Sequence, residues 1–193
     1  MAKPRNPYKL VEWGSVKHLH SISHDHVYTQ EHFDSLYNRG IRHISPSHYL
    51  PSHHWYPLEK HFNVPSDVIG SPNSEKAKMV EGNFHFGALG SLYNSDGHRT
   101  PDDEKLHWKD KYDNTLNSLQ FEDGGGIVQH HAPFARLSQV IERLNYDDRV
   151  LGIEIWNGRL ASYPDGQIRR DRGFYLDLWD EVLKAGVQCF GLS

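Results

Sequence analysis

Short apolar segments alternate with longer amphipathic ones along most of the chain, and the two patterns predict different elements. Strands are predicted where apolar residues alternate or run together, at residues 16–20, 41–45, 83–89, 127–130, 150–156 and 187–192. Helices are predicted where apolar residues recur at helical spacing, at residues 30–39, 101–119, 137–144 and 174–184. Because strands that alternate with helices form parallel β–α–β units, the pattern indicates an α/β fold.

Six such strands favour a barrel that closes on itself over an open sheet. The glycine-rich phosphate loops that are typical of nucleotide-binding open sheets do not occur in the sequence. With 193 residues the chain has the length of one domain, which we assign to residues 1–193. Since the chain stops directly after the last predicted strand, we expect this domain to be incomplete at its C-terminal end.

Composition and charge narrow the class of protein. The formal net charge of −4 argues against binding nucleic acid by neutralising its phosphates, although it allows a small phosphorylated substrate. The single cysteine, Cys189, excludes an intramolecular disulfide framework. The sequence has neither a secretory signal nor an apolar stretch of about 20 residues, so we expect no membrane partner and a cytoplasmic location.

Histidine is unusually frequent, with 15 residues, and the most informative ones lie near the N-terminus. His18 and His20 are one residue apart in the first predicted strand, so both side chains point to the same face. His26 follows after a short loop that can fold back towards them, and Asp25 is the alternative ligand there. Because imidazole is the commonest metal ligand near neutral pH, this segment predicts half of a zinc-type site.

Further candidate ligands occur close to the later predicted strands. His48 follows the second strand, and His131, which we favour over the neighbouring His130, follows the fourth. Glu75 precedes the third strand, and His85 lies within it. Histidines for terminal ligation and one carboxylate for bridging are the ligands that a multinuclear metal site needs.

The order and spacing of these motifs resemble those of the PHP (polymerase and histidinol phosphatase) metallophosphoesterases. The similar segments are residues 18–29, 47–48, 71–75, 84–90, 125–131 and 152–157. The chain departs from the family at three places: Ser47 rather than Asp precedes His48, Ala132 follows His131, and the last Asp-x-His motif is absent.

The resemblance implies a distorted TIM-like (β/α)7 barrel that holds two or three divalent ions, either zinc, manganese or iron. The ligands that it implies, grouped by metal, are His18, His20 and Glu75; Glu75, His85 and His131; and His26 with His48. It further implies hydrolysis of a small phosphate ester, because two or three metals lower the pKa of a water and hold phosphoryl oxygens.

We therefore interpret the sequence as a metal-dependent phosphoesterase of the PHP type. One alternative is another metallohydrolase on a similar barrel, such as an amidohydrolase, which activity towards amides or lactones would reveal. Another alternative is a non-catalytic metal-binding remnant, which the missing last motif favours.

Overall fold

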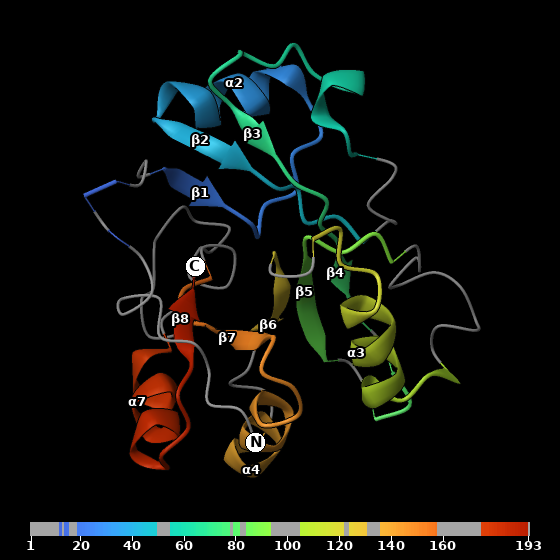
Figure 1. The fold of residues 1–193 in the computed structure, drawn as a ribbon, viewed down its shortest axis with the longest axis vertical. Helices are drawn as coiled ribbons and strands as arrows, with labels where there is room; N and C mark the ends of the chain where they lie inside the picture. The colour runs from blue at the N-terminus through green and yellow to red at the C-terminus, as the bar shows by residue number, and fades with distance from the viewer. Residues whose placement is uncertain are drawn as a thin grey trace, which may run out of the picture.

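The structure of the chain is a computed structural model. It describes residue 12 and residues 14–15, 19–49, 55–77, 79–81, 84–93, 105–121, 124–130, 136–157 and 175–192. These residues form two β-sheets with helices packed around them, which confirms the predicted α/β class (Figure 1). Among them, no helix has the length and apolar character that a membrane crossing requires.

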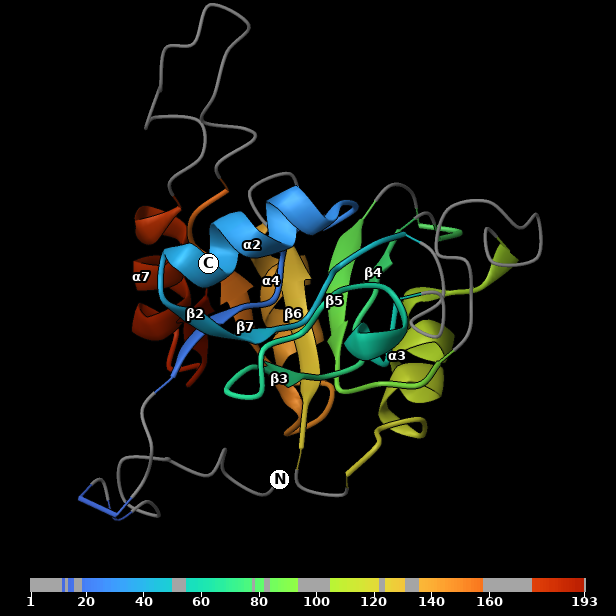
Figure 2. The ribbon, with the colours of Figure 1, turned by 90° about the horizontal axis from the view of Figure 1, so that it is seen from above.

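The first sheet contains three parallel strands in the order β1 (His20–Ile22), β2 (Ile41–Ile44) and β3 (Ile69–Gly70). Helix α2 (Gln30–Asn38) covers one side of this sheet, and the short 3₁₀ helix η2 (Leu58–Lys60) precedes β3 (Figures 1 and 2). The hydroxyl of Thr29 caps α2 by accepting a hydrogen bond from the backbone N–H of His32. A small core forms between these elements from Val27, Phe33, Leu36, Ile44, Leu58 and Phe62.

The second sheet contains five strands in the order β4 (Glu75–Lys76), β5 (His85–Leu89), β6 (Gly126–His130), β7 (Val150–Glu154) and β8 (Phe190–Leu192). Three helices pack against it, α3 (Trp108–Leu116), α4 (Leu137–Leu144) and α7 (Leu176–Lys184). The larger core lies between this sheet and the helices and includes Phe86, Tyr112, Ile127, Val140, Ile153 and Val182. Figure 1 places α4 and α7 at the end of the molecule opposite to α2.

The second sheet is mixed, whereas we had expected all of its strands to be parallel. β4 pairs with β5, and β5 with β6, in antiparallel fashion, whereas β6, β7 and β8 are parallel. The connection from β4 to β5 is too short for the crossover of a dozen or more residues that a parallel pair requires. Within the part of the chain that the structure describes, the strands form two separate sheets and no closed barrel.

The segment that leads into β4 joins the two sheets. Buried Asn73 donates hydrogen bonds from Nδ2 to the carbonyl oxygen of Ser23 after β1, at 2.7 Å, and to that of Ser45 after β2, at 3.0 Å. The backbone N–H of Glu75 donates to the carbonyl oxygen of His48, at 2.8 Å. These bonds bring Glu75, the first residue of β4, to the carboxyl ends of β1 and β2.

Candidate metal centre

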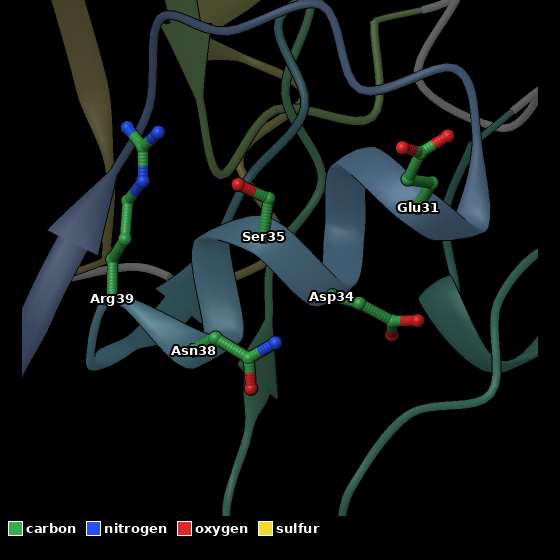
Figure 3. A pocket seen from close by; sticks show the side chains of 5 residues that line it. All are labelled: Glu31, Asp34, Ser35, Asn38 and Arg39. Atoms are coloured by element: carbon green, nitrogen blue, oxygen red, sulfur yellow. The ribbon is translucent and has the colours of Figure 1, made fainter.

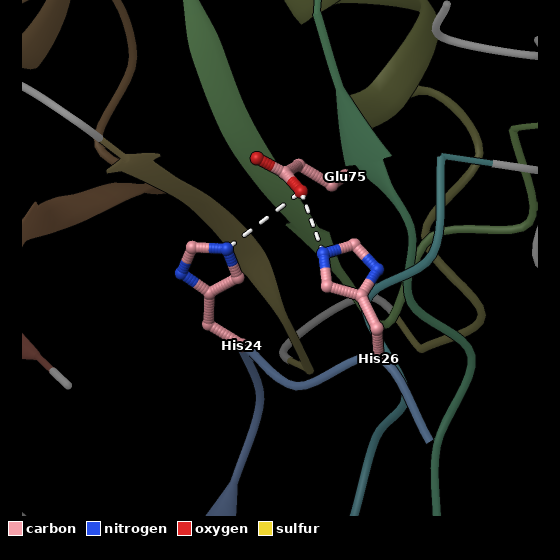
Figure 4. Close-up of side chains that lie close together, drawn as sticks. All are labelled: His24, His26 and Glu75. Carbon is pink, nitrogen blue, oxygen red and sulfur yellow. Dashed lines mark ion pairs between the residues drawn. The ribbon is translucent and has the colours of Figure 1, made fainter. Parts of the chain in front are cut away.

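Four imidazoles surround the carboxylate of Glu75, which is fully buried. Its Oε2 faces His26 Nε2 at 3.3 Å and His24 Nε2 at 3.7 Å (Figure 4). Its Oε1 lies 2.6 Å from His85 Nδ1 and 3.7 Å from His130 Nδ1. The carboxylate thus has two histidines on each oxygen, and the four come from the segment after β1, from β5 and from β6.

The elements explain why these side chains converge. His24 and His26 follow β1 with one residue between them, and Figure 4 shows both rings directed at Glu75. His85 begins β5 and His130 ends β6, and the two residues are paired partners in the antiparallel ladder. Because paired residues of a ladder place their side chains on the same face, both imidazoles lie on the Glu75 side.

The His-x-His pair that reaches Glu75 is His24 and His26, and the sequence analysis did not select His24. The described strand is His20–Ile22, so the residues directly beyond its carboxyl end are those around position 24. His20 lies at the amino end of β1, where it is solvent-exposed and pairs with Ile41. His18 lies outside the described residues.

Of each pair of alternative ligands, the structure places one member at Glu75. His130 lies in the cluster, whereas His131 lies outside the described residues. His26 faces Glu75, whereas the carboxylate of Asp25 contacts His32 of α2, with 3.3 Å between Oδ2 and Nε2.

His48 is buried beside the cluster and does not contact Glu75 through its side chain. Its ring centre is 5.6 Å from that of His26, and its Nε2–H donates to the carbonyl oxygen of Val27 at 3.0 Å. Burial and the neighbouring His26 lower the pKa of His48 to about 4, so its ring is neutral at pH 7. The proton is then on Nε2, and Nδ1 carries a lone pair with no hydrogen-bond partner among the described residues.

The histidines of the cluster keep the carboxylate of Glu75 ionised, although it is buried. Burial alone would raise the pKa of Glu75, but the surrounding histidines, His130 first, hold it far below its usual range. Burial alone would lower the pKa of His24, but hydrogen bonds to Glu154 and to Glu75 raise it to about 9. In the metal-free protein, His24 is therefore an imidazolium between two buried carboxylates.

Three of these residues could hold one metal ion. One ligand atom from each of His24, His26 and Glu75 lies within 4.8 Å of the other two. Two ligands of a tetrahedral zinc ion, each about 2.1 Å from the metal, are about 3.4 Å apart, close to the 3.3 and 3.7 Å found here. Three protein ligands leave a fourth position open, as in catalytic zinc sites. The buried Nδ1 atom of His48, which has no hydrogen-bond partner among the described residues, offers a further ligand atom nearby.

A surface hollow elsewhere on the molecule does not share these properties. It follows α2 and is lined by Glu31, Asp34, Ser35, Asn38 and Arg39 (Figure 3). The five side chains extend from the helix in different directions, carry charges of both signs, and include none of the residues around Glu75. We therefore place the candidate site at Glu75.

Comparison of the chain with protein-family models, with curated proteins and with solved structures finds no match. The support for a function therefore comes from the geometry of the site and from the order of the sequence motifs.

Gly87 in the middle of β5 is a sequence signal for this site, because a strand glycine often marks a close approach. It is paired with Glu75, and a Cβ atom at this position would lie 2.8 Å from Nε2 of His130. His130 has little room to retreat, since its ring stacks on that of His24 with 3.7 Å between the ring centres.

We expect Gly87→Ala to weaken metal binding about tenfold, because the methyl group displaces the His130 ring and with it His24. The unfolding free energy should fall by about 1–3 kcal/mol, the usual cost of overpacking. Isothermal titration with zinc measures the affinity, and unfolding in urea measures the stability. Gly14→Ala is the matched control, since a Cβ atom there meets open space; equal zinc affinity in both variants would contradict the prediction.

Proposed function

We propose that this chain is a metal-dependent hydrolase of phosphate esters, with its centre at Glu75. The observation that carries the proposal is the buried, charged carboxylate with two imidazoles at each oxygen. Histidines and a bridging glutamate from several strands are also what the resemblance to the PHP metallophosphoesterases implies. In this proposal the ligands of the first cation are His24, His26 and Glu75.

The other oxygen of Glu75 supports a second cation in the proposal. His85 and His130 lie at this oxygen, and His48 lies beside His26, with an Nδ1 atom that has no hydrogen-bond partner in the part of the chain that the structure describes. The proposed metals are zinc, manganese or iron, two or three per chain. The ligand set keeps Glu75, His26, His85 and His48 from the sequence analysis, and takes His24 and His130 as well.

The proposed fold is a distorted β/α barrel, of which the two sheets are parts. Two features support it. The segment 71–75 joins the sheets by hydrogen bonds, and the ends of β1, β2, β6 and β7 all contribute residues near Glu75. Enzymes with parallel β/α barrels place their sites at the carboxyl ends of the strands.

Divalent cations in such a site lower the pKa of a water molecule and neutralise charge on phosphoryl oxygens. The residues of the chain would bind these cations and orient them. Glu75 supplies a full negative charge, because its pKa is held far below neutral pH. The four histidines around Glu75 would bind the cations through their ring nitrogens, and their packing leaves the carboxylate without solvent exposure.

The test is metal-dependent hydrolysis by the purified chain. We expect protein stripped with a chelator to be inactive, and to hydrolyse p-nitrophenyl phosphate after manganese, zinc or ferrous iron is added. Elemental analysis should give at least one bound metal per chain. Absence of bound metal after metal-replete expression would contradict the metal centre. Activity on amides or lactones without activity on phosphate esters would instead support an amidohydrolase-like enzyme.

A further inference from the structure

A second buried carboxylate lies behind His24, on the side away from Glu75. Glu154 is the last residue of β7 and is 2% exposed. Its Oε1 is 2.5 Å from Nδ1 of His24. The side chain of Asn157, also buried, donates from Nδ2 to both oxygens of Glu154, at 3.0 and 3.2 Å.

We propose that Glu154, held by Asn157, is a positioning residue that fixes the tautomer and orientation of His24 for metal binding. The inference rests on the proposed metal centre. Glu154 itself contacts no cation in this arrangement, and it acts through the His24 ring.

The hydrogen-bonding capacity of the groups determines the tautomer. An ionised carboxylate only accepts hydrogen bonds, so the atom that faces Glu154, Nδ1 of His24, must carry a proton. When a cation replaces the other proton, the free lone pair is on Nε2. This is the atom that lies 3.7 Å from Oε2 of Glu75, on the side where the cation is proposed.

The orientation of the ring is restrained in two independent ways. The bond to Glu154 fixes the direction of Nδ1 in the plane of the ring. The ring of His130 lies almost parallel to that of His24, at 9° and with 3.7 Å between the centres, which fixes the plane itself. Together the two contacts leave Nε2 one direction, towards Glu75.

A carboxylate that accepts from the outer nitrogen of a ligating histidine also makes the ring a stronger donor. Loss of such a partner in known metal sites costs about 10–100-fold in affinity or activity. Asn157 strengthens the contact between Glu154 and His24, because its hydrogen bonds to both carboxylate oxygens keep the Glu154 side chain in place.

A purely structural role for the same ion pair makes different predictions. It would lower the unfolding free energy of a Glu154→Ala variant while the metal affinity and the coordination geometry stay unchanged. A positioning role predicts that both metal properties change, and that the change requires the His24 ring.

The experiment uses Co(II), whose visible absorption bands report coordination geometry. We expect Glu154→Ala to bind Co(II) about 10–100-fold more weakly than the wild type, with shifted bands. Glu154→Gln, whose amide oxygen still accepts from Nδ1, should lose less affinity and keep the wild-type bands. Glu142→Gln, an exposed glutamate of α4, is the control and should equal the wild type.

A double-mutant cycle with His24→Gln completes the test. Removing Glu154 should have no further effect on Co(II) affinity in the His24→Gln background, because the effect acts through that ring. Unchanged affinity and bands in Glu154→Ala would overturn the inference, as would full additivity in the cycle.

Nuclear magnetic resonance of the metal-free protein separates this inference from the proposed function. The proton on Nδ1 of His24 should be protected from exchange in the wild type and exposed to exchange in Glu154→Ala. If the wild type binds no Co(II), the metal centre is wrong and the positioning role with it. If it binds Co(II) but the Nδ1 proton is unprotected, only the role of Glu154 is wrong.

Discussion

Glu75→Gln should abolish metal binding and hydrolysis together. The substitution keeps the size of the side chain and removes the negative charge that one cation, or two, would share. We expect the affinity for zinc or manganese to fall about 1,000-fold or more, equivalent to about 4 kcal/mol. Hydrolysis of phosphate esters should become undetectable at metal concentrations that saturate the wild type. Isothermal titration and a p-nitrophenyl phosphate assay measure the two effects.

The same variant reports on the metal-free fold. Four histidines face the carboxylate, so its neutralisation removes their charged partner and should reduce the unfolding free energy in chelator by about 1–3 kcal/mol. Glu142→Gln is the matched control, because Glu142 is exposed and its ion pair with Lys109, at 3.9 Å, contributes little to stability. A Glu75→Gln protein that binds zinc as tightly as this control would show that Glu75 is not a ligand.

The metal-free protein should lose stability as the pH rises from 6.5 to 9. The folded chain holds a proton on His24 with a pKa of about 9, whereas the unfolded chain releases it near 6.5. The stabilisation is therefore complete below pH 6.5 and is lost as the pH passes 9. Its size is about 3 kcal/mol, which urea unfolding in chelator at a series of pH values measures.

Metal binding should follow the opposite trend over the same interval. A cation must displace the proton from His24, so affinity should rise about tenfold per pH unit up to about pH 9. His24→Gln removes the titrating ring, and its stability in chelator should be nearly constant between pH 6.5 and 9. An identical alkaline loss in His24→Gln would assign the effect to another group.

The acidic side has a different origin. His48 resists protonation until about pH 4, although the unfolded chain takes up this proton near 6.5. Stability therefore also falls as the pH drops from 6.5 towards 4, and below about pH 4.5 the depressed pKa of Glu75 adds to this loss. Both trends place the most stable metal-free state near pH 6.5.

Local periodicity was sufficient for most of the helices. The prediction at 137–144 agrees with α4, and the prediction at 30–39 agrees with α2 to one residue. These helices have apolar faces whose spacing is visible in one short window. The helix predicted at 101–119 begins in the structure only at Trp108, after His107 as its N-cap.

Pairing between strands could not be predicted from local pattern. β4 has two residues, too few to show an alternation, and the antiparallel pairing of β5 with β6 joins segments that are far apart in the chain. Our prediction of a closed, fully parallel barrel assumed that a crossover connection precedes each strand. The link between β4 and β5 is too short to form one.

The candidate site depended on the position of one strand end. The sequence contains His-x-His twice within nine residues, at 18–20 and at 24–26, and the spacing alone does not distinguish them. A predicted strand at 16–20 selected the first pair, whereas β1 ends at Ile22 and presents the second. Glu75, His26 and His85 were selected from the sequence and do lie together.

The joining of the sheets at Asn73 and Glu75 would give the proposed centre a mechanical role. Its proposed ligands come from segments as far apart in sequence as His24 and His130. An ion held there would act as a reversible cross-link that closes a loop over more than half of the chain. Any cation that binds only the folded state also shifts the folding equilibrium in proportion to its concentration. The supply of metal would then determine how much of the protein is folded.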